Sequence, residues 1–185
     1  MSFEIALVVG ALGSLLIAVI TWALGLPRRA SQRRVAALGW LWAAGVVGLT
    51  FGTGPGGGKA INLALLDLGN SADRVDFLLN TVMFFPGGIL LSILRARLRS
   101  VILFGLLASL AIETAQYMTG SGRTADINDL LSNTIGCAFG YLCARMVAET
   151  VAHRSRRTAL ARSIGTGRAT GRGRRITRAG LSRPD

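Results

Sequence analysis

The chain has 185 residues, a net charge of +12, a mean hydropathy of +0.49 and 16% charged residues, whereas soluble domains carry about 25% charged residues. This composition excludes an ordinary soluble protein and predicts one polytopic membrane domain followed by a basic tail. The single histidine, His153, lies in that tail. Its position excludes a Ser-His triad or a histidine-ligated zinc site inside the membrane.

Five apolar segments are long enough to cross a bilayer, for which roughly 17–25 residues are needed. They cover residues 5–26, 35–52, 77–94, 101–118 and 127–147. The first segment is not expected to be a cleaved signal peptide, because Glu4 stands where a basic leader would be and Pro27 and Arg28 follow without a small-residue cleavage site. We therefore predict an all-α membrane domain over residues 1–152 with about five transmembrane helices.

Arginines concentrate in alternate loops and predict the orientation of the chain. The loops after the first, third and fifth spans hold Arg28, Arg29, Arg33, Arg34, Arg95, Arg97, Arg99 and Arg145. Since basic loops stay on the cytoplasmic side, we expect the N-terminus outside and the C-terminus in the cytoplasm. The connection over residues 53–76 then lies outside. Its apolar piece, residues 61–68, is too short to span and fits either an interfacial segment or a loop lying on the bundle.

The tail, residues 153–185, is expected to be disordered and cytoplasmic, because it is rich in Arg, Gly, Ser and Thr and has almost no large apolar residue. Ten arginines lie between Arg154 and Arg183. Anionic lipid head groups attract such segments by about 1 kcal/mol per basic residue. Since no fold or aromatic platform for reading bases is present, we expect no specific nucleic-acid partner.

Each of the last three spans carries one stripe of polar and small residues, placed at about 100° per residue. The stripes are Asp76, Asn80 and Gly87; Gly105, Ser109, Glu113 and Gln116; and Asp126, Asp129, Asn133, Gly136 and Gly140. Lipid offers polar groups no hydrogen-bond partner, so these stripes should face the bundle interior. The spacing of Gly136 and Gly140 is typical of closely packed membrane helices.

The polar members of these stripes lie near the extracytoplasmic ends of their spans, with Arg123 in the short loop above them. They predict one polar pocket that opens outward, and ionisable groups at such depth usually serve a function. The candidate ligand-binding residues are Asn80, Glu113, Gln116, Arg123, Asp126, Asp129 and Asn133.

Three blocks of sequence carry a resemblance to a known family. They are Asn-Thr-Val-Met-Phe-Phe-Pro-Gly-Gly at residues 80–88, Ser109-x-x-x-Glu113-x-x-Gln116, and Arg123-x-x-Asp126-x-x-Asp129-x-x-x-Asn133-Thr134-x-Gly136. Over residues 35–147 the chain resembles the VanZ-like family of small bacterial membrane proteins. Asn62-Leu63 also resembles a family segment, although the Pro-Phe that usually follows it is replaced by Ala64-Leu65. The resemblance implies a multi-pass protein of the bacterial plasma membrane with a role in the cell envelope, since the founding member is associated with teicoplanin resistance.

Three functions fit these residues. The pocket could engage an envelope amphiphile, such as a lipid-linked precursor or a lipoglycopeptide. It could instead process a lipid or polyprenyl head group, with Glu113, Asp126 or Asp129 as general base or as ligands of a divalent cation; no other cofactor is evident. In the third interpretation the protein is a structural assembly partner without a ligand, in which Arg123 pairs with Glu113 or Asp126 and Asp126 or Asn128 caps the fifth span.

Overall fold

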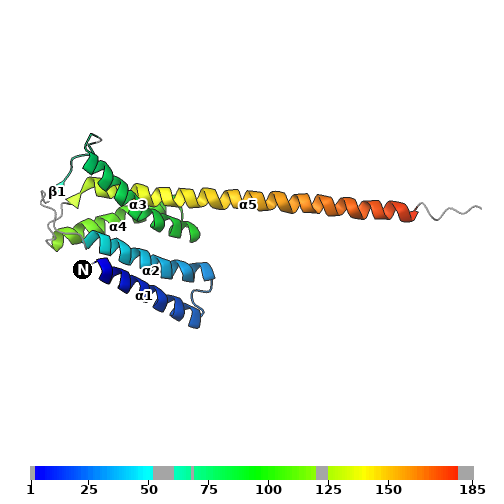
Figure 1. Cartoon of the computed structure of the whole chain (residues 1–185), viewed down its shortest axis with the longest axis horizontal. Helices are drawn as coiled ribbons and strands as arrows, with labels where there is room; N and C mark the ends of the chain where they lie inside the picture. The colour runs from blue at the N-terminus through cyan, green and yellow to red at the C-terminus, as the bar shows by residue number, and fades with distance from the viewer. Residues whose placement is uncertain (1–2, 52–60, 68, 120–124, 179–185) are drawn as a thin grey trace, which may run out of the picture. The chain divides into compact units, whose positions relative to one another are not determined.

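A computed structural model describes residues 3–51, 61–67, 69–119 and 125–178. The elements follow in the order α1 (Phe3–Ala23), α2 (Ala30–Phe51), β1 (Ile61–Asn62), α3 (Ser71–Ile93), α4 (Leu98–Met118), β2 (Ala125–Asp126) and α5 (Ile127–Arg178) (Figure 1). The chain divides into two compact units, Met1–Ala144 and Arg145–Asp185. All five helices are long and apolar enough to cross a membrane, which confirms the prediction of five spans.

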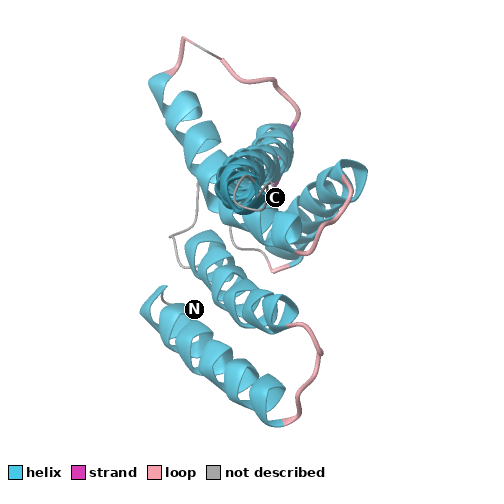
Figure 2. Ribbon diagram, turned by 90° about the vertical axis from the view of Figure 1, so that its right-hand side faces the viewer, coloured by secondary structure: helices cyan, strands magenta, loops and turns pink. Residues whose placement is uncertain are grey.

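The first two helices form an antiparallel pair, seen side by side in Figure 2. A Cβ built on Gly10 would lie 2.9 Å from the Cβ of Ala44, so only a hydrogen fits at this crossing. Nearby, the indole N–H of Trp40 donates to the carbonyl oxygen of Val9 at 3.3 Å. The guanidinium group of Arg33 also donates to the carbonyl oxygen of Thr21 at 3.4 Å. Close packing and two long hydrogen bonds therefore join these helices, as expected where lipid gives no hydrophobic drive between helices.

Trp42 connects α2 to the remaining helices of the same unit. Its indole N–H donates to the carbonyl oxygen of Met83 at 2.8 Å. Its ring meets Phe84 edge-on with centroids 5.7 Å apart and lies 6.2 Å from the ring of Phe104. The side of α3 that receives the indole carries Gly87, where a Cβ would come within 2.7 Å of the Trp42 ring. One aromatic side chain thus reaches both α3 and α4.

Glycines allow α3 and α5 to run parallel with their backbones in contact. A Cβ on Gly136 would collide with the carbonyl oxygen of Thr81, and one on Gly140 with that of Phe85. On the other helix, a Cβ on Gly88 would collide with the carbonyl oxygen of Cys137. Because both partners in each pair advance together along the chain, these contacts fix the register of α3 against α5. The small-residue stripe predicted for the fifth span therefore faces a helix and not lipid.

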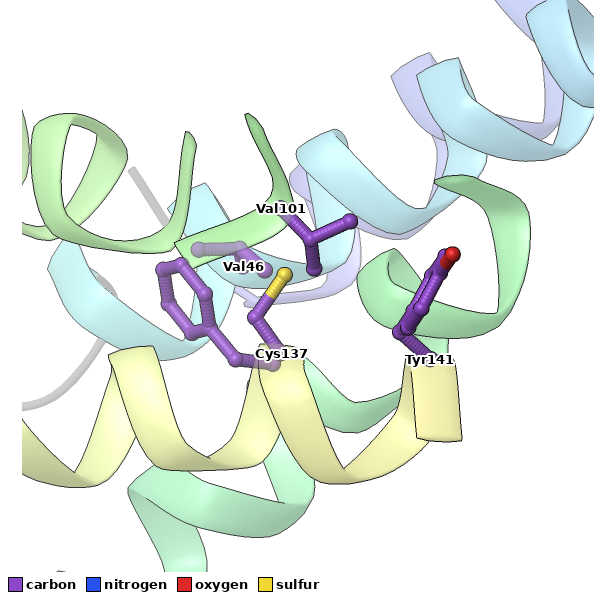
Figure 3. Packing of buried hydrophobic residues seen from close by; sticks show 5 residues of the cluster. Val46, Val101, Cys137 and Tyr141 are labelled. Atoms are coloured by element: carbon purple, nitrogen blue, oxygen red, sulfur yellow. The ribbon is translucent and has the colours of Figure 1, made fainter. Parts of the chain in front are cut away.

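The apolar core lies where these helices converge. Val46, Val101, Cys137 and Tyr141 meet there in Figure 3, together with the fully buried Phe84. The hydroxyl of Tyr141 donates to the carbonyl oxygen of Ala96 at 2.8 Å, which ties α5 to the turn between α3 and α4. Burial in this core accounts for Cys137, which stands among apolar neighbours as a small hydrophobe.

The connection before α3 forms a short parallel ladder with the segment before α5. Ile61 pairs with Ala125 and Asn62 pairs with Asp126. Leu63 and Leu65 beyond the ladder are about three-quarters exposed, at 73% and 72%. Exposed leucines fit an interfacial segment as well as a loop lying on the bundle, so both interpretations of residues 61–68 remain predictions for the described part, residues 61–67.

The second unit differs from the expectation of a disordered tail, because α5 continues as helix through Arg178. Arg and Ala are strong helix formers, and Arg145 and Glu149 form an i,i+4 ion pair at 3.0 Å. Every side chain described from 145 to 159 is exposed. Local propensity, and not burial, therefore supports the helix over these residues.

The glycine contacts predict a difference between two Gly→Ala exchanges in spanning helices. Alanine is favoured over glycine in a helix by about 1 kcal/mol. Nothing lies within 4 Å of a Cβ on Gly45, so Gly45→Ala should be neutral or slightly stabilising. Gly140→Ala should lower the free energy of unfolding by about 1–3 kcal/mol through overlap with Phe85. Thermal unfolding in detergent, followed by circular dichroism, compares the two; equal midpoints would contradict the close packing of α3 and α5.

Candidate functional site

Polar side chains from three helices gather at one end of the first unit, where α3 and α5 begin and α4 ends. We call this group the polar cluster. Its members are Asn62, Asn80, Ser109, Glu113, Asp126, Asn128, Asp129 and Asn133. Most are buried or half-buried in helices whose other faces are apolar, so hydrogen bonds among them replace contacts with water.

Asp126 sits at the centre of the polar cluster and caps α5. Its carboxylate accepts from the backbone N–H of Asn128 at 2.8 Å, which satisfies a donor that the first helical turn leaves free. It also accepts from the side-chain amide of Asn128 at 2.9 Å and from that of Asn62 at 2.9 Å. The backbone N–H of Asp126 donates to Oε2 of Glu113 at 3.2 Å. The capping role expected of Asp126 is thus present, combined with bridges to α4 and to β1.

Asn128 fastens the segment that follows β1. Its Oδ1 accepts from the N–H of Leu66 at 2.9 Å, and its Nδ2 donates to the carbonyl oxygen of Ala64 at 2.9 Å. The side chain therefore binds two backbone groups in the way a neighbouring strand would. Neither Asn62 nor Asn128 was among the predicted ligand-binding residues. For Asn62, the resemblance of Asn62-Leu63 to a family segment was a signal that could have indicated its place in the cluster.

The second carboxylate joins α3 to α5. Nδ2 of Asn80 donates to Oδ1 of Asp129 at 2.6 Å, a short bond of the kind that an ionised acceptor strengthens. One turn of α5 further, Nδ2 of Asn133 donates to Oγ of Ser109 at 2.9 Å. Ser109 in turn donates to the carbonyl oxygen of Asp129 at 3.3 Å. These bonds link both α3 and α4 to α5.

Three polar side chains in this part of the bundle are deeply buried. Glu113 is 7% exposed, Gln116 is 4% exposed and Asn133 is 2% exposed. Nε2 of Gln116 donates to the carbonyl oxygen of Thr50 at 3.3 Å, so this residue reaches α2. Oδ1 of Asn133 has no hydrogen-bond partner in the described part of the chain. A buried amide oxygen in that state costs free energy unless a further donor reaches it.

The structure brings together six of the seven predicted ligand-binding residues at one end of the bundle. Arg123 lies outside the described residues. Within residues 3–51, 61–67, 69–119 and 125–178, no three Asp, Glu, His or Cys side chains form a group able to hold a metal ion. Each of the carboxylates of Glu113, Asp126 and Asp129 accepts at least one hydrogen bond from a described residue.

The bonds of Asn128 predict a local effect on exchange. Asn128→Ala removes both bonds to the segment, so the amide of Leu66 should exchange with solvent about tenfold faster, since two lost bonds of this kind are worth roughly 1–3 kcal/mol. Asn70→Ala is the matched control, because the side chain of Asn70 caps α3 through the N–H of Ala72 and does not bond residues 64–66. Hydrogen exchange with mass spectrometry measures both. Equal exchange at Leu66 in the control and in Asn128→Ala would contradict the assigned role.

The five spanning helices agree with the comparison to known families. The VanZ/LLP1 family model matches residues 15–148, which extends the expected range of 35–147 into α1. Comparison with curated proteins and with solved structures found no match. The matched region contains α2, α3 and α4 complete, together with the second half of α1 and the start of α5 through residue 148. The chain therefore belongs to the VanZ/LLP1 family.

Proposed function

We propose that the polar cluster binds the donor-rich head group of a cell-envelope amphiphile at the extracytoplasmic face. The observation that carries the proposal is Oδ1 of Asn133, an amide oxygen that is buried and lacks a partner within the described chain. Hydroxyl, amide or amine donors of a ligand would satisfy such an oxygen. A lipid-linked precursor or a lipoglycopeptide offers these donors on a molecule that also carries an apolar chain.

The helix surface beside the polar cluster suits the apolar part of such a ligand. On α4, Leu110 lies three residues before Glu113, on a neighbouring part of the helix surface, and is 51% exposed; Leu106, one turn further along the same side, is 38% exposed. In a bilayer these side chains face lipid tails. An amphiphile would then lie with its chain along α4 and its head group turned into the polar cluster, without leaving the membrane.

Within this proposal the residues divide into two groups. Asp126 and Asn128 are occupied by the cap of α5 and by the segment after β1, so they position the site. Glu113, Asp129 and Asn133 lie deeper along the helices and are the groups assigned to the ligand. Binding or exclusion of a lipoglycopeptide at this place would give resistance of the teicoplanin type associated with the VanZ-like relatives.

One observation favours a second candidate function, a structural clasp. Three hydrogen bonds made by the side chains of Asp126 and Asn128, together with the pairing of β1 with β2, hold residues 62–66 against the start of α5. A protein whose task is to present this segment to a partner would need the clasp and no ligand. The two functions differ in the need for a charge at Glu113, which does not touch the segment in any bond described.

Glu113→Gln separates the ligand from the clasp. Glutamine keeps the shape and an oxygen able to accept from the N–H of Asp126, so the fold should persist, whereas the charge is lost. In a host where the wild-type protein raises the inhibitory concentration of teicoplanin, the variant should give at least about tenfold less protection, as expected for the loss of a charged hydrogen bond of roughly 1.5–3 kcal/mol.

Asp76→Asn is the control for that experiment. Asp76 was predicted to face the bundle interior, but in the structure its carboxylate is exposed near the start of α3, at the same end of the bundle as the polar cluster. It should protect as the wild type does. Full protection by Glu113→Gln at equal protein level would show that ionisation is not needed. A wild-type protein that gives no protection would contradict the resistance part of the proposal.

The outward position of the polar cluster is tested by labelling from either side. In a variant with Cys137 and Cys143 replaced by alanine, Ser71→Cys at the start of α3 should react with a membrane-impermeant maleimide in intact cells. Ser100→Cys at the start of α4 should react only after lysis, because the basic loops stay inside. Both serines are exposed. The reverse pattern would place the cluster in the cytoplasm.

A further inference from the structure

A cavity of about 360 Å³ opens at the end of the bundle opposite the polar cluster, where α2 begins and α3 ends. It is lined by Arg29, Ser31, Gln32, Ile93, Leu94 and Arg95. All of these residues belong to the first unit. The cavity lies between the two loops whose arginines predict a cytoplasmic location, so it is distinct from the proposed outward site.

The conformation of Arg95 is unusual for its residue type. Its φ of 58° lies in the left-handed region, which glycine adopts without cost and other residues avoid. The position completes a Schellman ending of α3, with the N–H of Arg95 bonded to Ser92 O at 2.9 Å and that of Ala96 to Leu91 O at 3.1 Å. Glycine is the usual residue there. Arg95 therefore holds a strained backbone conformation, and its side chain lines the cavity.

The charges of the cavity are not balanced by the chain around it. In the described residues neither Arg29 nor Arg95 has a carboxylate within ion-pairing distance, and no acidic residue lines the cavity. The hydroxyl of Ser31 and the amide of Gln32 add donors. The first turn of α2 adds the partial positive charge of a helix N-terminus. Two guanidinium groups, two neutral donors and a helix start thus surround one open space.

We propose that this cavity binds a phosphate ester that carries net negative charge. Guanidinium groups bind phosphate through paired, charge-assisted hydrogen bonds. Ile93 and Leu94 are 46% and 42% exposed in the same wall and offer an apolar surface for the rest of the ligand. A phospholipid head group in the inner leaflet and a soluble phosphate monoester both present this chemistry.

The test is native mass spectrometry of the full-length protein in detergent, titrated with dioleoyl-phosphatidylglycerol, with zwitterionic dioleoyl-phosphatidylcholine and with sn-glycerol 3-phosphate. Arg95→Gly should relieve the backbone and keep the helix end, so a fold defect is not expected. It should nevertheless weaken binding of the anionic ligand at least about fivefold, and Arg29→Gln should do the same. Arg99→Gln, an exposed arginine outside the cavity, should change binding less than twofold.

Selective binding of phosphatidylglycerol that glycerol phosphate does not displace would support the proposal with a lipid as the source. Displacement by glycerol phosphate would support it with a soluble ester. Equal binding of both phospholipids without binding of glycerol phosphate would overturn it. Equal losses in Arg95→Gly and Arg99→Gln would also overturn it, because they would show attraction to overall charge and not to the cavity.

Discussion

Backbone contact between α3 and α5 is the constraint on which the polar cluster depends. Gly136 and Gly140 let α5 approach the carbonyl oxygens of Thr81 and Phe85, where any side chain would collide. In lipid, such close packing replaces the hydrophobic drive that joins helices in water. The register that this packing sets places Nδ2 of Asn80 2.6 Å from Oδ1 of Asp129. A shift of either helix would break this bond and leave the half-buried carboxylate of Asp129 without the amide of Asn80.

The two ends of the first unit carry opposite hydrogen-bonding chemistry. Carboxylate and amide oxygens concentrate where α5 begins, whereas guanidinium groups line the cavity where α3 ends. Acceptors suit a head group rich in hydroxyls and amides, and arginines suit a phosphate. The asymmetry of charge that predicts the orientation of the chain therefore also separates the two proposed kinds of binding chemistry.

The sequence was sufficient to predict the spans, since long apolar runs have few alternatives to a membrane helix. It also predicted that Asp126, Asp129, Asn133, Gly136 and Gly140 share one face, because helical geometry fixes that arc. The sequence did not predict which amide side chain binds which carboxylate. The pairs Asn62 with Asp126 and Asn80 with Asp129 join residues far apart in the chain, and they depend on the register that glycine packing sets.

Two other features were outside the reach of sequence reasoning for different reasons. The cavity beside Arg95 combines two loops and a left-handed residue, and neither pattern nor spacing reports a positive φ at arginine. The helical course of α5 through Arg178 was not predicted, because the composition of the tail argued against a packed core. Over residues 145–159, strong helix formers and the ion pair of Arg145 with Glu149 support a helix without a core.

The most direct test of the account is the identity of what the polar cluster holds. The protein is extracted with its surrounding lipid by a styrene–maleic acid copolymer, and bound molecules are identified by mass spectrometry in the wild type and in Asn133→Leu. Leucine is branched at Cγ, as asparagine is, but cannot form a hydrogen bond to a head group. We expect an envelope amphiphile to co-purify in near-stoichiometric amount with the wild type. At equal folded yield, about tenfold less of this amphiphile should co-purify with the variant. The same bulk phospholipids in both, with no enriched amphiphile, would contradict it.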